Sequence, residues 1–377
     1  MKHYFISGGT GVVGSAIADA LLSRPGNRII MLIRAGSDEH VQSRLDELCR
    51  FWERDPAAVR GRVTMLRGDT TLPRFGLTGA DFERLSRQCT HIVHCAAVVR
   101  MNLPLAEARD SALGAAQNVV CLAQQGREHG VLQKVEFLST VGVWGRHPGR
   151  LPERVITEPR TFHNSYEHAK AEAETYLEQR IVEGLPVTIH RPSMVVGDSR
   201  TGRVRRFQIF YHLVEFLTGA RTLGAFPRFG RTRLDIVPVD FVAAAVIWSS
   251  EQTAMIGRVL HLCSGPEGSI ALGDLRRMVR AAAATQGARL FPAIGLPIAL
   301  FRGVASGIGA LSPPKVRRAI ATLPVFLDYL AEDQSFANEN TLVALREGGI
   351  ELPPVARYLP KVLAYYFTLA QEDPVRR

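Results

Sequence analysis

A glycine-rich segment close to the N-terminus constrains the fold of this chain more than any other feature. The sequence SGGTGVVG occupies residues 7–14, directly after an apolar run and before a helical pattern. In such a strand–turn–helix unit the glycines permit a tight turn, a close approach of backbone to a pyrophosphate, and close helix–sheet packing. A glycine-rich turn without a ligand is the alternative. We expect a dinucleotide to be bound by Gly8, Thr10, Gly11, Val12, Val13 and Gly14.

Short apolar runs alternate with longer helical stretches over the first 190 residues. None of these runs alternates strictly between apolar and polar residues, which is typical of strands that are covered on both faces. The pattern predicts an α/β fold of the Rossmann type, in which helices wind both faces of a parallel sheet. The predicted strands are His3–Ser7, Arg28–Ile33, Val63–Arg67, His91–Cys95, Val135–Ser139 and Val187–His190.

The alternation ends after Arg191, and this change predicts a second, smaller lobe. Residues 204–233 are basic and aromatic, whereas Leu234–Val239 and Arg258–Cys263 resemble strands that return to the sheet. We expect an NADP-binding Rossmann domain over 1–200 plus about 233–264. A discontinuous substrate-binding lobe would comprise about 201–232 plus 265–377.

The composition limits the compartment and the partners of the protein. The five cysteines are odd in number and form no CxxC pair, so we expect neither disulfides nor a zinc site. No other residues have metal-ligand spacing and no serine lies in a GxSxG setting, so we expect neither metal catalysis nor a hydrolase triad. No signal peptide begins the sequence, so a cytoplasmic location is expected. The formal charge of +10 favours acidic partners such as coenzyme A, an acidic carrier protein or an anionic membrane surface, and we expect no nucleic-acid partner. A solvated basic face is the alternative.

A tyrosine and a lysine lie four residues apart at the start of a predicted helix. This spacing puts Tyr166 and Lys170 on one face, where an ammonium group would lower the pKa of a phenol from about 10 toward the working range. Ser139 and Thr140 lie at the end of a predicted strand, where hydroxyls border the ligand crevice. We assign catalysis to Thr140, Tyr166 and Lys170; a strand-terminating hydroxyl is the alternative for Thr140.

Arginine occupies the place that selects between the two nicotinamide cofactors. An NAD-preferring site commonly has an acidic residue about 20 positions after the glycine motif, at the end of the second strand. This chain has Arg34 there and Arg44 in the following helix. Guanidinium groups suit a 2′-phosphate, so we expect NADPH. An exposed residue at the strand end is the alternative for Arg34.

The chain resembles the extended short-chain dehydrogenases/reductases, and within them the thioester reductase and fatty acyl-CoA reductase group. The motifs that carry this resemblance cover about residues 3–265 and include YEHAK at 166–170, GDTTLPRFGL at 68–77, RPSMVVGDSRTG at 191–202 and LDIVPVDFVA at 234–243. The resemblance implies further cofactor contacts by Asp69, Ala96, Lys170 and Pro192. Two departures are Ser7, where the family has threonine, and Ser111, where it often has an asparagine that supports a proton relay.

The resemblance implies an NADPH-dependent reductase of an acyl thioester, bound to coenzyme A or a carrier protein, that forms an aldehyde and then an alcohol if a second reduction follows. Alternatives are a ketoreductase or hydroxy-dehydrogenase acting on a lipid, polyketide or sterol-like substrate, and a non-catalytic NADP sensor. We expect the acyl chain in an apolar channel formed by Phe207–Leu217 and Leu290–Leu330. The phosphates of a pantetheine arm or an acidic carrier would meet Arg200, Arg203, Arg205 and Arg206.

Overall fold

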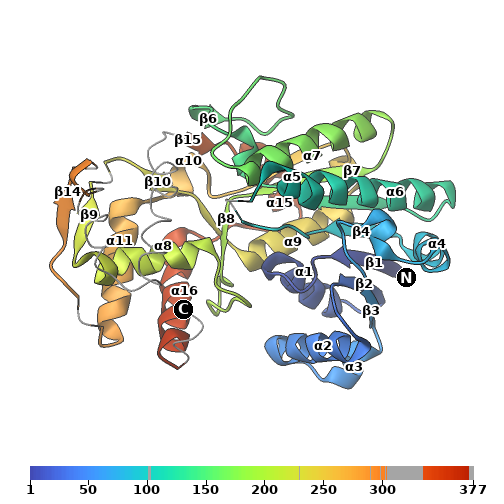
Figure 1. Ribbon diagram of the computed structural model, residues 1–377, viewed down its shortest axis with the longest axis horizontal. Helices are drawn as coiled ribbons and strands as arrows, with labels where there is room; N and C mark the ends of the chain where they lie inside the picture. The colour runs from blue at the N-terminus through green and yellow to red at the C-terminus, as the bar shows by residue number, and fades with distance from the viewer. Residues whose placement is uncertain are drawn as a thin grey trace.

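The computed structural model describes residues 1–100, 103–228, 230–288, 290–297, 299–301, 303 and 334–372. A seven-stranded parallel sheet with the order β12-β7-β5-β4-β1-β2-β3 forms its centre (Figure 1). The predicted α/β fold is therefore confirmed. The strands of this sheet are β1 (Lys2–Ser7), β2 (Asn27–Ile33), β3 (Val63–Arg67), β4 (His91–His94), β5 (Lys134–Leu138), β7 (Val187–Pro192) and β12 (Val259–Leu262).

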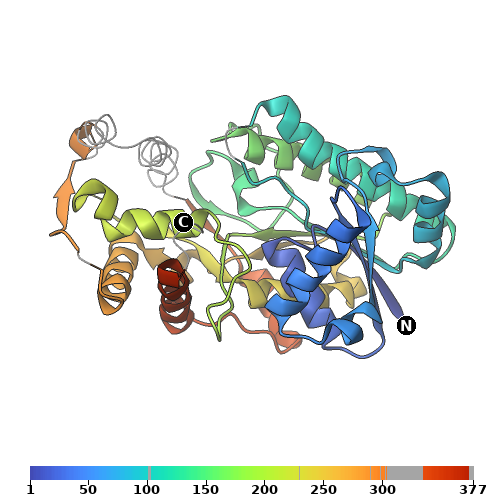
Figure 2. The same ribbon diagram turned by 60° about the horizontal axis from the view of Figure 1, so that its bottom comes forward.

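Helices cover both faces of this sheet, as Figure 2 shows. One face is covered by α1 (Val12–Leu22), α2 (Asp38–Trp52) and α9 (Val239–Ser250), and the other by α4 (Gly79–Gln88), α6 (Ala115–Glu128) and α7 (Ser165–Val182). Side chains of β1 alternate between the two cores, with Tyr4 and Ile6 in one and Phe5 in the other. This double burial explains why the strands are apolar without a polar face.

One predicted strand does not return to the central sheet. The segment Leu234–Val239 divides into β10 (Arg233–Leu234), which pairs with β13 (Ile270–Ala271), and β11 (Ile236–Pro238), which pairs with β8 (Met194–Val196). The prediction was wrong here because β12 occupies the place beside β7. Arg258–Cys263 does join the sheet, as predicted.

A second hydrophobic core lies beyond the carboxyl ends of the strands. It joins α8 (Ile209–Thr218), α11 (Leu272–Thr285) and α16 (Val355–Glu372), which stand together away from the sheet in Figure 1. Two short strands, β9 (Ala225–Pro227) and β14 (Ile294–Leu296), pair beside this core. The segments that meet here come from both parts of the lobe that the sequence suggests.

One part of the C-terminal region lies against the sheet domain. Strand β15 (Gln334–Phe336) pairs with β6 (Gly149–Leu151), and α15 (Glu339–Glu347) contacts β12. We keep the two-part division as a proposal, with residues 334–347 counted with the sheet. The remaining short elements are α3 (Pro56–Arg60), α5 (Leu105–Arg109), α10 (Gly265–Gly268), η1 (Pro73–Gly76), η2 (Asp110–Gly114), η3 (Val141–Trp144), η4 (Ala220–Thr222) and η5 (Thr253–Met255).

Candidate active site

A cavity of about 350 Å³ opens at the carboxyl ends of the central strands, between the sheet and the second core. This is the edge at which ligands bind in open parallel sheets, and the volume lies within the range typical of small-molecule sites. The lining residues from the sheet side are Gly11, Val12, Val13, Gly14, Cys95, Ala97, Leu138, Ser139, Thr140, Tyr166, Lys170 and Pro192. Those from the lobe side include Met194, Gln208, Ile209, Leu213, Leu234 and Asp235.

The glycine loop leaves no room for side chains at two of its positions. A Cβ on Gly8, whose φ is +77°, would lie 2.5 Å from the backbone nitrogen of Ala96, and a Cβ on Gly14 would lie 2.3 Å from the Gly8 carbonyl. The loop therefore packs closely on β4 and on the start of α1, as a dinucleotide cradle requires. Ala96 contacts this loop, whereas its neighbours Cys95 and Ala97 line the cavity.

Tyr166 and Lys170 lie in the first turns of α7 and both line the cavity. The helix begins there because the side chain of Asn164 accepts a hydrogen bond from the backbone nitrogen of Glu167 at 3.0 Å. Lys170 is only 2% exposed, and its Nζ donates to the Leu138 carbonyl at 2.9 Å. Burial lowers the pKa of Lys170 to about 8.

The environment of Tyr166 differs from the sequence expectation. Burial raises the pKa of Tyr166 above its ordinary value, and the adjacent Glu167 carboxylate raises it further. The expected lowering by Lys170 does not appear in this environment. Because Lys170 is buried and directs its Nζ to the Leu138 carbonyl, the site favours the protonated phenol, which is the form that donates a proton.

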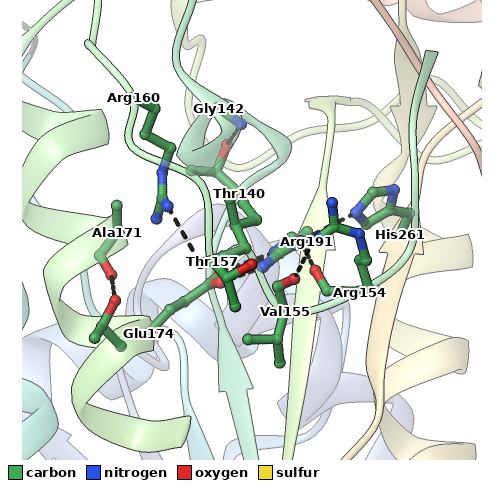
Figure 3. Close-up of polar contacts among 12 residues, drawn as sticks. Thr140, Gly142, Arg154, Val155, Thr157, Arg160, Ala171, Glu174, Arg191 and His261 are labelled. Carbon is green, nitrogen blue, oxygen red and sulfur yellow. Dashed lines mark hydrogen bonds and ion pairs between the residues drawn. The ribbon is translucent and has the colours of Figure 1, made fainter. Parts of the chain in front are cut away.

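Two hydroxyl groups at the end of β5 line the cavity beside Tyr166. Thr140 precedes η3, and its Oγ1 accepts a hydrogen bond from the Gly142 nitrogen at 3.2 Å, which leaves its O–H to donate (Figure 3). The hydroxyl of Ser139 is buried without a hydrogen-bond partner among the described residues. Both side chains therefore present a donor to the same cavity.

A buried ion pair supports the helix that carries the catalytic candidates. Arg191 on β7 is 0% exposed, and its Nε and Nη2 donate to Glu174, at distances of 3.0 and 2.5 Å to the nearer carboxylate oxygens (Figure 3). Its Nη1 donates to the Arg154 carbonyl at 2.9 Å and lies 3.3 Å from Nε2 of His261. Glu174 follows Lys170 by one helical turn. Sequence patterns do not predict this pair, because its two residues are 17 positions apart and lie on different elements.

Asp235 adds an acidic group to the lobe side of the cavity. Its carboxylate accepts hydrogen bonds from the backbone nitrogens of Ser264 at 2.7 Å and Gly265 at 2.9 Å. Burial nevertheless raises the pKa of Asp235 to about 6. Asp235 lies in the motif LDIVPVDFVA at 234–243, for which no site role is predicted from the sequence.

Three further cofactor candidates lie outside the cavity lining, near the end of β2. The side chain of Arg34 is 68% exposed, and its Nη1 lies 3.9 Å from the Asp69 carboxylate. Asp69 also accepts hydrogen bonds from the backbone nitrogen and the hydroxyl of Thr71, both at 2.9 Å. Arg44, on α2, donates from Nε to the His40 ring at 3.1 Å. These positions are on the side of the glycine loop where an adenosine would lie.

One expectation about the substrate channel needs correction. Of the lobe segments named for it, Phe207–Leu217 contributes Gln208, Ile209 and Leu213 to the cavity, but no described residue of 290–303 lines it, and 304–333 lie outside the described residues. Instead, Leu290, Leu296 and Phe301 pack in the second core. The basic residues Arg200, Arg203 and Arg205 pair with Asp198, Glu53 and Glu47, and their contact with substrate phosphates or a carrier stays a prediction.

Within the described part of the chain, no group of three or more His, Cys, Asp or Glu side chains has the arrangement to hold a metal ion. The helices described there include none long and apolar enough to cross a membrane. Ser111, the departure from the family pattern, lies in the π-helical turn η2, which packs on α7.

Curated relatives match about two thirds of the chain. The glycine betaine reductase ATRR of Emericella nidulans is 28% identical over 275 residues, which are 69% of this chain and 21% of that protein. The L-2-aminoadipate reductase of Schizosaccharomyces pombe is 25% identical over 278 residues, 70% of this chain and 19% of that protein. The chain therefore spans about a fifth of the length of these relatives.

Solved structures share the complete fold. The terminal R domain from the myxalamid PKS-NRPS biosynthetic pathway has a TM-score of 0.82 at 24% identity, covering 99% of this chain and 91% of that one. A thiolation-reductase di-domain from an archaeal non-ribosomal peptide synthetase has a TM-score of 0.77 at 19% identity, covering 100% and 76%.

The family itself is set by a match over residues 6–246 to the family described as male sterility protein. This match covers more than half of the 377 residues and includes the glycine loop, Thr140, Tyr166 and Lys170. The chain thus belongs to the male sterility protein family of NAD(P)-dependent reductases, within the extended short-chain dehydrogenases/reductases.

Proposed function

We propose that this protein reduces an acyl thioester with NADPH, releasing an aldehyde and a thiol. The observation that carries the proposal is the convergence of Thr140, Tyr166 and Lys170 on a cavity that the glycine loop also lines. Relatives that are named as reductases, and structures named as reductase domains of peptide and polyketide synthetases, support a thioester substrate. Carrier-protein or coenzyme A thioesters are the proposed substrate class.

The glycine-rich loop of residues 7–14 fits a dinucleotide. Gly8 and Gly14 make the close approaches that exclude a Cβ, and Gly11 to Gly14 face the cavity at the start of α1. When bound, NADPH supplies the hydride that the carbonyl carbon accepts. The arginines at positions 34 and 44 support NADPH over NADH because each offers a guanidinium group to a 2′-phosphate.

The side chains of the site perform the remaining chemistry. Thr140 and Tyr166 donate hydrogen bonds to the carbonyl oxygen, and these bonds strengthen as negative charge develops there. Tyr166 then gives its proton to that oxygen, and the raised pKa of the phenol keeps this proton in place until the charge forms. Lys170 holds the nicotinamide ribose with its buried ammonium group, which lines the same cavity as Tyr166.

Collapse of the resulting hemithioacetal completes the reaction. The carbon–sulfur bond breaks as the hydroxyl group of the hemithioacetal returns its proton to the Tyr166 phenolate and becomes a carbonyl. The sulfur leaves as a thiolate, which takes a proton from solvent to give the thiol. A second reduction of the aldehyde in the same site would give an alcohol. The ketoreductase alternative uses the same three residues and differs only in having no thiol to release.

The location and partners are also part of this proposal. All five cysteines are free, which suits a reducing compartment, and we place the enzyme in the cytoplasm. An acidic carrier protein is the proposed partner, and peripheral contact with an anionic membrane is the alternative that the basic net charge supports.

A substrate panel tests the proposal. NADPH oxidation is measured with acyl-CoA thioesters of increasing chain length, with the same acyl groups on a carrier protein, and with ketones of matched size. The proposal expects turnover of thioesters with formation of aldehyde. Brisk reduction of ketones without turnover of any thioester would instead establish the ketoreductase alternative.

A further inference from the structure

The segment of residues 197–206, here called the strap, joins β8 to the region before α8 and has no role in the proposed chemistry. It contains the end of the motif RPSMVVGDSRTG, which distinguishes this group of reductases in the sequence. In both ribbon views the strap runs between α16 and the helices α1 and α2 (Figures 1 and 2). It therefore lies between the second core and the cofactor domain.

Contacts at three points fix the strap. The nitrogen and hydroxyl of Ser199 donate to the two carboxylate oxygens of Asp240 at 2.8 and 2.6 Å, which joins the strap to the first turn of α9. Asp198 accepts hydrogen bonds from the nitrogens of Arg200 and Thr201, both at 2.9 Å. A Cβ on Gly202, whose φ is +75°, would lie 2.2 Å from the Lys361 carbonyl in α16. The strap thus has a defined conformation.

Two arginines of the strap reach the cofactor domain and bind different parts of it. Arg203 donates to the Phe51 carbonyl at 2.7 Å and pairs with Glu53, both at the end of α2. Arg205 donates from Nη1 to the carbonyl of Thr10, inside the glycine loop, while its Nη2 lies 3.3 Å from Glu47. Only Arg205 therefore touches the loop that binds the cofactor phosphates.

The surroundings of Arg205 are crowded with positive charge. Its side chain is 7% exposed, compared with 32% for Arg203. Burial lowers the pKa of Arg205, and the neighbouring charges of Arg206 and Arg44 lower it further, whereas Glu47 opposes them. Three cations thus gather near a single carboxylate at the glycine loop, and a dianion placed there would relieve their repulsion.

We propose that Arg205 binds the adenosine 2′-phosphate of NADPH together with Arg44, so that a residue of the strap helps to select the cofactor. Three observations carry this: the contact of Arg205 with Thr10, the burial of its guanidinium group at the loop, and the nearby positive charge of Arg44. The inference rests on the proposed use of NADPH. Arginine suits this role because its planar group meets phosphate oxygens in pairs.

The competing explanation is that Arg205 only holds the loop in shape through the Thr10 carbonyl. Binding of three ligands separates the two: NADPH, NADH, and adenosine 2′,5′-bisphosphate, which carries the 2′-phosphate without the nicotinamide. Dissociation constants are measured by titration calorimetry for wild type, Arg205→Met and the matched control Arg203→Met. The control removes a strap arginine of the same type that does not touch the loop.

The proposal expects Arg205→Met to weaken NADPH and the bisphosphate by about tenfold or more, while NADH changes by less than about threefold, since a hydrogen bond to a charged group is lost only with the 2′-phosphate. Arg203→Met should leave all three within about threefold. Equal weakening of NADPH and NADH by Arg205→Met would overturn the proposal and assign the residue to loop shape.

Three further cases each have a defined interpretation. If Arg205→Met does not fold, Arg205→Lys replaces it, and a selective loss of bisphosphate affinity supports the proposal, whereas no loss or an equal loss with NADH contradicts it. A wild type that binds NADPH and NADH equally refutes the proposed cofactor preference itself. A wild type that prefers NADPH, with Arg205→Met equally selective, refutes only the role of Arg205.

Discussion

Arg191 and Glu174 form a fully buried ion pair that ties β7 to α7, one helical turn beyond Lys170. The pair fixes two sides of the cavity together, because β7 ends at Pro192 and α7 presents Tyr166 and Lys170. Glu174 also opposes the lowering of the Lys170 pKa by burial. The geometry of the candidate catalytic residues therefore depends on a contact between two residues that do not line the cavity.

Breaking this pair should destabilise the protein strongly. Arg191→Met leaves the Glu174 carboxylate buried without its partner, which typically costs about 3–5 kcal/mol. Urea unfolding of wild type and of Arg191→Met measures the loss of stability. The double variant Arg191→Met/Glu174→Met should recover most of the loss, since it leaves no unpaired charge; a double variant as unstable as the single one would contradict this account of the pair.

Lys170 should make cofactor binding depend on pH in the range near 8. Its pKa is lowered from 10.5 to about 8, so the folded protein loses this proton as the pH rises through 8 and the positive charge at the ribose disappears. NADPH affinity should therefore fall between about pH 7 and pH 9. Lys170→Met should bind NADPH weakly and show none of this pH dependence. An unchanged pH profile in that variant would assign the titration to another group.

The same group affects stability in the opposite direction. Between pH 8 and 10.5 the unfolded chain holds the proton of Lys170 and the folded chain has lost it. The free energy of unfolding that this group contributes therefore rises with pH across that window. Chemical unfolding at several pH values, with Lys170→Met as the control, measures this contribution; a contribution that falls with rising pH would contradict the buried ammonium group.

Tyr166→Phe should abolish turnover and leave NADPH binding nearly intact, since the variant lacks only the hydroxyl group. A positioned general acid is typically worth about 10²–10⁴-fold in rate. Single-turnover reduction and cofactor titration measure the two effects separately. A variant that retains more than a few per cent of the wild-type rate would show that another group supplies the proton.

Arg34→Ala should reduce the preference for NADPH. The side chain is exposed at the end of β2, and its contact with a charged group among the described residues is a long one of 3.9 Å to Asp69, so its removal should not disturb the fold. Affinity for NADPH should fall by about tenfold while NADH affinity stays near the wild-type value. Parallel loss of both cofactors would mean that Arg34 does not bind the 2′-phosphate.

Local sequence patterns predicted the sheet and the placement of Tyr166 and Lys170 at one site. A strand followed by a glycine turn and a helix is a local unit, and an i, i+4 spacing on a helix fixes which side chains share a face. The six early strands and the strand at Arg258–Cys263 were found for this reason. The pairing partner of Leu234–Val239 could not be predicted in the same way, because β12 takes the place beside β7 at this edge of the sheet.

The features that were missed depend on contacts between distant segments. Arg205 contacts Thr10, which is 195 residues away in the sequence, and Ser199 contacts Asp240, which is 41 residues away. Spacing within one helix or strand therefore cannot predict these contacts. The pKa of Tyr166 was misjudged because the sequence shows the nearby lysine but not the burial that outweighs it. Long-range packing decides each of these cases.

The stoichiometry of thiol release tests the central claim most directly. Purified enzyme is given NADPH and an acyl-CoA thioester, and the free thiol, the aldehyde and the oxidised cofactor are measured in the same reaction, with Tyr166→Phe as the control. Equal amounts of thiol, aldehyde and oxidised cofactor are expected, or half as much thiol as oxidised cofactor if an alcohol forms. Tyr166→Phe should form none of these products. Oxidation of NADPH with a ketone, without thiol release from any acyl-CoA or carrier-bound thioester, would contradict it.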